Sequence, residues 1–302
     1  MTQLATGGAR VRGFGATMRR DGWWVGPLLT FLVLLSFVIY ATWAGLQGTH
    51  FEIREHPDFT GRPVAPYLSP FYSPLIYDAV SPHAWITLAE GETAPGWWPS
   101  WFPRFSAAIL ILAGPVLFRF TCYYSRKAYY RAFWADPPAC AVGEPRKNYW
   151  GENHWPLLGQ NAHRYFLYIA LGFLIILWWD TLLAFWWPTD RGGQFVTGGQ
   201  FGVGVGTLVM LANIILLTGY TLGCHSLRHL VGGRLNNFAC FACVNGKVDQ
   251  SKLRTGYRLW RINTMLNERH ALWAWLSLFS VGLTDVYIRL CSTGVIHDVR
   301  IV

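Results

Sequence analysis

Five long apolar stretches, separated by segments that carry charged residues, are the feature that most limits how this chain can fold. A membrane-spanning helix needs about 20 mostly apolar residues. The stretches that meet this length lie at about 25–45, 105–124, 164–187, 201–224 and 270–291. We therefore predict an all-α integral membrane protein, in which a bundle of about five transmembrane helices forms a single membrane domain over residues 1–302.

The composition agrees with a membrane protein. The chain is 52% hydrophobic and 14% charged, whereas a soluble domain has about 25% charged residues. Several of the 17 Trp residues occur as pairs near the ends of apolar stretches, as Trp23-Trp24 and Trp186-Trp187 do, which is typical of interfacial aromatic belts. The basic residues 1–24 precede a stretch long enough to span, so we expect no cleavable signal peptide. The net charge of +9 comes with no nucleic-acid-binding motif, so we expect membrane lipid and no nucleic acid as a partner.

The distribution of Lys and Arg predicts the orientation. Basic residues are concentrated in segments 1–24, 125–163 and 225–269, whereas 46–104 has more acidic than basic residues. The positive-inside rule then places the N-terminus and the two basic loops in the cytoplasm, and the C-terminus outside the cytoplasm. Because segment 46–104 is rich in proline and aromatic residues, we expect an ordered extracytoplasmic loop there.

Ionisable residues also occur in or near the apolar stretches, namely Asp180, Asp285 and Arg289. Such residues face the interior of the bundle, line a pathway, or form paired charges near an interface. The sequence leaves these readings open.

Cysteine and histidine residues collect on the predicted cytoplasmic side. The run Cys224-His225-Ser226-Leu227-Arg228-His229 stands at the cytoplasmic end of the fourth stretch. If the helix continues, His225 and His229 are one turn apart on one face and could share a metal ion. The same residues also fit a polar helix end with a buried Cys. Disulfides do not persist in the cytoplasm, so metal binding or burial is the better reading of these cysteines.

Two further candidates lie in the loop 125–163. Cys140 follows the restricted backbone of Pro137-Pro138, which suits a fixed ligand. His163 enters the third helix and could be a ligand, a quinone hydrogen-bonding group or a helix-start residue. The pair Cys240 and Cys243 forms a C-x-x-C without two further ligands nearby.

The candidate metal ligands are therefore Cys140, Cys224, His163, His225 and His229, all on one predicted side. Two Cys and two His can hold a Rieske-type [2Fe–2S] cluster, and two His from facing helices could instead hold a haem b. The haem alternative adds His270 to the three histidines above. Arg164, Tyr165 and Arg228 lie beside these residues and are candidates for a quinone or cluster environment.

Several motifs resemble one family. They are Pro138-Ala139-Cys140-Ala141-Val142, Gln160-Asn161, His163-Arg164-Tyr165-Phe166, Cys224-His225-Ser226, Arg228-His229, Gly232-Gly233-Arg234, Leu276-Ser277-Leu278-Phe279-Ser280-Val281 and Thr284-Asp285. Together they are similar to the membrane anchor subunit of mycobacterial-type succinate dehydrogenase 1, a class of complex II. The likeness covers most of the chain from about residue 105 onward.

The resemblance implies a function and its partners. The chain would anchor a flavoprotein subunit and an iron–sulfur subunit at a bacterial cell (inner) membrane, and the complex could form higher oligomers. It would pass electrons from the iron–sulfur subunit through a membrane-embedded Rieske-type cluster to a quinone. The dicarboxylate site would lie in another subunit. The alternatives are a haem-binding cytochrome anchor, and a transporter or purely structural anchor in which Asp180 and Asp285 form a path.

Overall fold

The computed structural model describes most of the chain. The described residues are 13–53, 65–79, 81, 83–89, 92, 95–99, 106–146, 153–155, 157–190, 192–232, 243–244, 247–248 and 250–302, without the side chains of 107 and 243–256. The chain divides into two compact units, Met1–Ile39 with Phe120–Asn161, and Tyr40–Arg119 with Ala162–Val302.

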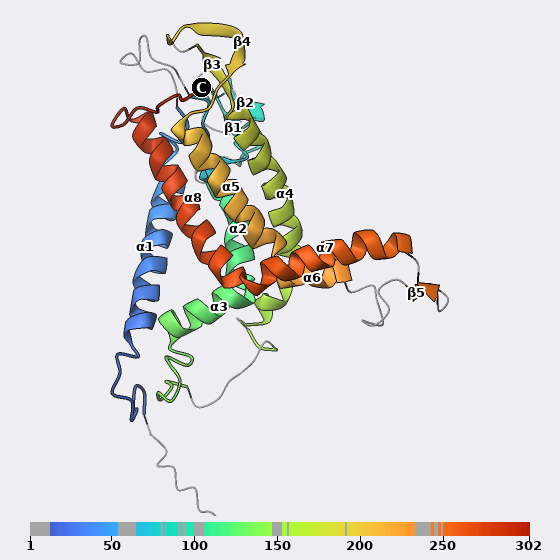
Figure 1. Cartoon of the computed structure of the whole chain (residues 1–302). Helices are drawn as coiled ribbons and strands as arrows, with labels where there is room; N and C mark the ends of the chain where they lie inside the picture. Colours follow the sequence, from blue (N-terminus) through green and yellow to red (C-terminus); the bar gives the residue numbers. More distant parts are fainter. Residues whose placement is uncertain are drawn as a thin grey trace, which may run out of the picture. The chain divides into compact units, whose positions relative to one another are not determined.

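Helices dominate the described residues, which confirms the predicted all-α class (Figure 1). The α-helices are α1 (Val25–Gln47), α2 (Ala107–Thr121), α3 (Tyr123–Tyr129), α4 (His163–Leu183), α5 (Val205–Leu222), α6 (His225–Gly232), α7 (Gln250–Glu268) and α8 (His270–Ser292). Short helical turns occur at η2 (Pro70–Tyr72), η3 (Tyr130–Trp134) and η4 (Leu157–Ala162). The strands are short: β1 (Tyr77–Asp78), β2 (Ile86–Thr87), β3 (Trp186–Thr189), β4 (Phe195–Phe201), β5 (Cys243–Val244) and β6 (Lys247–Val248).

Among the described residues, four helices are long and apolar enough to span a membrane without a break, and they are α1, α4 with its preceding turn, α5 and α8. The pair α2 and α3 is sharply bent at Cys122 and makes a fifth span if it counts as one. About five spans were predicted, and the structure agrees. The boundaries differ where strands replace helix. The third span ends at Leu183 rather than at 187, and the fourth begins at Val205 rather than at 201. The reason is that β3 and β4 pair as an antiparallel hairpin, with Trp186 opposite Phe201.

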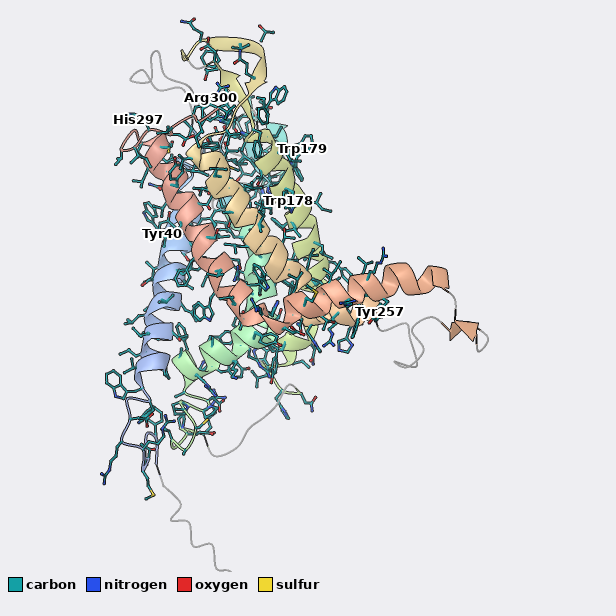
Figure 2. The ribbon with its side chains drawn as sticks, viewed as in Figure 1. Tyr40, Trp178, Trp179, Tyr257, His297 and Arg300 are labelled. Carbon is teal, nitrogen blue, oxygen red and sulfur yellow. The ribbon has the colours of Figure 1, made fainter. Side chains whose placement is uncertain are left out.

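In the second unit, α5 packs against both α4 and α8. Gly219 of α5 allows a close approach to α8, because a Cβ there would lie 2.7 Å from the ring of Trp273 on α8. Small residues commonly permit such contacts between membrane helices. Trp178 of α4 donates from its ring N–H to Thr218 Oγ1 of α5 at 2.9 Å, whereas its neighbour Trp179 is exposed on the outer side of α4 (Figure 2).

The antiparallel order of these helices brings different segments together at the two bundle ends. The start of α4, the end of α5 and the start of α8 share one end, which we call the histidine end. The opposite end carries η2, the β3–β4 hairpin and the C-terminal residues 298–302 (Figure 1). Within the predicted loop 46–104, the described residues Tyr67, Leu68, Phe71 and Tyr72 are buried. Residues 54–64, 80, 82, 90–91, 93–94 and 100–104 of this loop lie outside the described residues.

Candidate functional site

The break between α5 and α6 positions the first candidate ligand. The helix α5 ends at Leu222 with Gly223 as its cap, and the new helix α6 begins at His225. Cys224 therefore stands between two helices, and its N–H donates to the carbonyl of Thr221. Only 1% of Cys224 is exposed. The break between α5 and α6 fixes the direction of the Cys224 side chain. The sequence did not predict this break.

Cys224 meets His163 at the histidine end. His163 is the first residue of α4, and its Nε2 lies 3.2 Å from Cys224 Sγ. The imidazole also stacks on Phe118 of α2, with ring centroids 4.9 Å apart and an interplanar angle of 7°. Three elements thus hold an imidazole against a buried sulfur.

The second pair of candidates lies on α6. His225 and His229 are one turn apart, as predicted, and their Nε2 atoms are 3.1 Å apart. Burial, together with the nearby His229 and Arg228, lowers the pKa of His225 below its usual value. A lowered pKa favours the neutral imidazole, which is the form that binds metals.

The amphipathic helix α7 packs against the end of α5 and against α6. Asn263 donates to the carbonyl of Leu222, and Asn267 donates to the carbonyl of Gly223 at 2.8 Å. Both carbonyls belong to the last turn of α5, where no intrahelical donor is available. Arg228 of α6 lies over the ring of Trp260 on α7, 5.3 Å from its centroid. The sequence analysis did not predict α7 as a helix, although its apolar and polar residues alternate with helical spacing.

A stack of three side chains lies beside the His163–Cys224 pair, and sequence reasoning missed most of it. The guanidinium of Arg119 on α2 is 4.5 Å from the ring centroid of Tyr220. Tyr220 in turn stacks on His270, with centroids 4.9 Å apart. Arg119 also donates to Ala274 O and Ser277 Oγ at 2.9 Å and 2.7 Å. An Arg inside the apolar stretch 105–124 is the signal that would have found it, whereas His270 entered the sequence analysis only in the haem alternative.

The other predicted site residues fall elsewhere. Arg164 and Tyr165 are exposed on the outer surface of α4, with Tyr165 70% exposed, so they do not line the buried His163–Cys224 contact. Cys140 belongs to the first unit, where it is exposed and its carbonyl accepts from Arg19 Nη1 at 2.9 Å. Cys240 and the side chain of Cys243, which form the C-x-x-C of the sequence, lie outside what the structure describes.

The donor chemistry fits a cluster with sulfur and imidazole ligands in part. One thiol and three imidazoles gather at the histidine end as two close pairs. Among the described residues, however, no three His, Cys, Asp or Glu side chains come together at metal-ligand spacing. A Rieske-type cluster takes two Cys on one iron and two His on the other, so the His225–His229 pair matches one half of such a ligand set, and Cys224 supplies one thiol of the other half.

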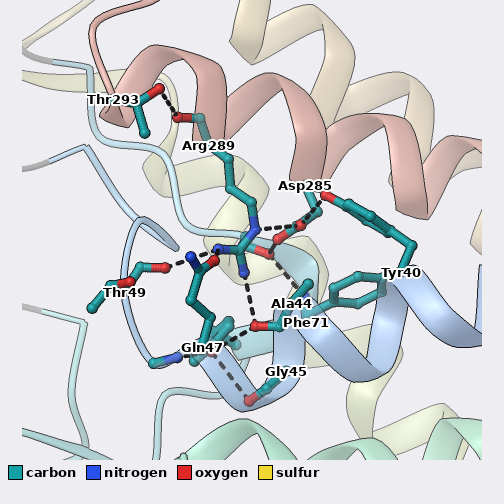
Figure 3. A network of polar contacts seen from close by, with 12 residues as sticks. Tyr40, Ala44, Gly45, Gln47, Thr49, Phe71, Asp285, Arg289 and Thr293 are labelled. Atoms are coloured by element: carbon teal, nitrogen blue, oxygen red, sulfur yellow. Dashed lines mark hydrogen bonds and ion pairs between the residues drawn. The ribbon is translucent and has the colours of Figure 1, made fainter.

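At the opposite end of the bundle, the ionisable residues in the spans are paired. The side chains of Arg289 and Asp285 are 8% and 0% exposed, and Arg289 Nε donates to Asp285 Oδ2 at 2.7 Å. Asp285 also accepts from the hydroxyls of Tyr40 and Ser69. Figure 3 shows the guanidinium surrounded by further acceptors, which are the carbonyls of Ala44 and Thr49 and the side chain of Gln47.

Asp180 on α4 accepts in the same way from the hydroxyl of Ser73. The ion pair with Arg289 favours the paired reading of Asp285 over a path.

Comparisons with known proteins extend over nearly the whole chain. A family model described as actinobacterial succinate dehydrogenase subunit SdhC matches residues 25–294. Among solved structures, the chain is similar to a chain of the Mycobacterium smegmatis Sdh1 complex in the apo form, with 39% sequence identity and a TM-score of 0.74. That similarity covers 95% of this chain and 94% of the other. No curated protein matches the chain significantly. The matched residues include the whole histidine end.

Proposed function

Because the chain belongs to the actinobacterial succinate dehydrogenase subunit SdhC family, we propose that it passes electrons to a quinone through a Rieske-type [2Fe–2S] cluster at the histidine end. The chain is a multi-pass membrane subunit of succinate dehydrogenase, a complex II enzyme, and other subunits of that enzyme are its partners. The electrons would come from the iron–sulfur subunit, which receives them from the flavoprotein. The observation that carries the proposal is the convergence of His163, Cys224, His225 and His229 at one bundle end.

Geometry favours His225 and His229 as the two imidazole ligands of one iron. Two metal–nitrogen bonds of about 2.1 Å at a tetrahedral angle separate the nitrogens by roughly 3.4 Å, and the two Nε2 atoms are 3.1 Å apart. Two histidines one turn apart on one helix cannot reach opposite faces of a haem, so this pair does not favour the haem alternative. Cys224 supplies one thiolate to the other iron, and Cys140 remains the sequence-based prediction for the second.

His163 then acts on the sulfur rather than on a metal. Its Nε2 is at hydrogen-bond distance from Cys224 Sγ, and a hydrogen bond to a ligand sulfur raises the reduction potential of an iron–sulfur cluster. Arg228 and Arg119 bring positive charge to the same region, which favours an added electron. When bound, a cluster with two imidazole ligands accepts single electrons at a higher potential than an all-cysteine cluster.

The exposed residues of α4 suit the quinone. A quinone reaches the protein from the bilayer, so its headgroup meets the outer surface of a span first. Arg164 and Tyr165 are exposed there, one and two residues after His163. A cation and a phenol can donate hydrogen bonds to the quinone oxygens. Two electrons and two protons convert the quinone to a quinol, and the positive-inside rule places this end at the cytoplasmic face.

The test removes one ligand from the assembled complex. His229→Ala should abolish quinone reduction and the electron paramagnetic resonance signal of a Rieske-type cluster. Succinate oxidation with an artificial soluble acceptor should persist, because that activity needs only the cytoplasmic subunits. His297→Ala is the matched control, since His297 is exposed at the opposite end of the bundle (Figure 2).

Three outcomes would count against the proposal. A His229→Ala complex that assembles and reduces quinone at the normal rate would show that His229 is no ligand. A sharp reduced α-band in the absorption spectrum of the unaltered complex would establish haem instead. Iron near zero in the membrane subunit of an active complex would leave a non-redox anchor.

A further inference from the structure

The helix α7 presents three stripes of different chemistry, each repeating at helical spacing. The inward stripe consists of Trp260, Asn263 and Asn267, which contact α6 and the end of α5. Residues at i, i+3 and i+7 share one face of an α-helix. Two other stripes begin at Leu259 and Arg258, one and two residues before Trp260. Both therefore point away from this packed face.

The second stripe is apolar and open. It consists of Leu259, Ile262 and Leu266, and the first two are 52% and 53% exposed. A large aliphatic side chain left half in water forgoes much of its transfer free energy. Contiguous apolar side chains of this kind mark a surface that something else covers.

The third stripe, Arg258 and Arg261 with Met265, is exposed and mainly basic. An apolar stripe flanked by Arg is typical of helices that lie in the plane of a membrane interface. On such a helix the apolar stripe reaches the acyl chains, and the basic stripe stays at the level of the headgroups, where it borders the aqueous phase.

The position of α7 agrees with such a location. Only Arg269 separates it from the span α8, and α7 runs across the direction of α8 (Figure 1). Leu272 and Leu276, in the first turns of α8, are already exposed as lipid-facing residues would be. The apolar zone of the bilayer therefore begins within about two turns of the end of α7.

We propose that α7 is an interfacial helix whose stripe Leu259–Ile262–Leu266 rests in the bilayer surface, with Arg258 and Arg261 at the level of the lipid headgroups and open to the aqueous side. This contact would brace α6 and the α5 end from the lipid side, because Asn263 and Asn267 join α7 to them. The inference rests on α7 and the start of α8, and it is independent of whether a cluster or a quinone binds at the histidine end.

The test uses photo-crosslinking in the intact complex. A phenylalanine that carries a trifluoromethyl diazirine replaces Ile262 on the apolar stripe in one variant, because the carbene formed on illumination inserts into lipid C–H bonds and adds water where no lipid is near. In the matched control it replaces Tyr257, which lies on another face and is also exposed. Both complexes are reconstituted in vesicles of phosphatidylcholine and phosphatidylglycerol, illuminated and analysed by mass spectrometry of this chain. Size-exclusion chromatography before illumination confirms assembly.

We expect phospholipid adducts from position 262 at several times the yield from position 257. A crosslink from position 262 to another succinate dehydrogenase subunit would overturn the proposal and assign the stripe to a protein interface. Addition of water at position 262, without lipid adducts, would also overturn it, because the stripe would then face solvent. If no cluster assembles in one of the variants, the crosslinking result can still be interpreted, because it depends only on the position of α7.

Discussion

At the scale of single residues, the His163–Cys224 contact is the most informative feature of the site. The two residues are 61 positions apart in the sequence, so no local turn brings them together. The imidazole is fixed by its stack on Phe118, and the sulfur is fixed by the break after α5. Where its Nε2 carries the proton, an imidazole held at a ligand sulfur in this way tunes a cofactor without binding it.

Replacing His163 by Phe tests that role. The phenyl ring can keep the stack on Phe118 but cannot donate to Cys224 Sγ. A hydrogen bond worth about 0.5–1.5 kcal/mol corresponds to roughly 20–60 mV for a one-electron couple. We expect the midpoint potential of the cluster to fall by that amount in a redox titration followed by electron paramagnetic resonance. Loss of the Rieske-type signal would instead make His163 a ligand, and an unchanged potential would remove it from the site.

The Asp285–Arg289 pair predicts a stability effect. Arg289→Met leaves the carboxylate of Asp285 buried without its cation, which typically costs about 3–5 kcal/mol. We expect a clearly lower thermal unfolding midpoint for the purified complex. The double variant with Asp285→Asn removes the uncompensated charge and should recover part of the loss. If the double variant is less stable than Arg289→Met, the carboxylate does not need its partner and the interpretation fails.

At the scale of elements, α7 has one face that packs on the histidine end and other faces that are exposed to the surroundings of the bundle. Its inward stripe holds the last carbonyls of α5, and its Trp260 lies under Arg228 of α6. Charged residues follow a different face, with Arg258 and Arg261 exposed. One helix can thus fix the His pair through one face and meet a partner through another.

Charge reversal tests the partner face. Arg254, Arg258 and Arg261 are spaced at i, i+4 and i+7 in the sequence, and replacing all three by Glu should weaken attachment of the iron–sulfur subunit. Exposed charges steer and hold partners in a salt-dependent manner, so we expect that subunit to be lost at raised salt during co-purification. The matched variant with three Lys keeps the charge and should behave as the unaltered chain does. Equal retention of the subunit by the Glu and Lys variants across a salt series would contradict the prediction.

At the scale of the whole molecule, the number of spans decides on which side of the membrane each end lies. Four unbroken helices and the bent pair α2–α3 give five crossings if the pair counts as one. With a cytoplasmic N-terminus, five crossings place the histidine end in the cytoplasmic half and the C-terminus outside. If α2–α3 re-enters without crossing, the two termini lie on the same side.

Reporter fusions distinguish these arrangements. A reporter at the C-terminus should be active only outside the cytoplasm, and one inserted within 240–255 should be active only inside it, because one span separates the two positions. A reporter at the N-terminus provides the reference. A cytoplasmic C-terminal reporter would show that α2–α3 does not cross or that another helix has been miscounted.

The sequence alone was sufficient for the properties that depend on neighbouring residues. Apolar run length predicted the spans, because crossing a bilayer requires a helix of fixed minimum length. The spacing of His225 and His229 predicted their pairing, because the α-helix sets the distance between residues one turn apart. The motifs from Pro138 to Asp285 were enough to identify the family, which the comparisons confirm.

Tertiary structure decided the contacts between distant segments. Three features depend on how helices pack. They are the break at Gly223 and Cys224, the stack of Arg119, Tyr220 and His270, and the hydroxyls that surround Asp285. Helical periodicity gives the face of a residue but not which other helix that face will meet. The same limit applied to α7, since its low apolar content hid it from a search for spans, and only packing showed which of its three stripes is buried.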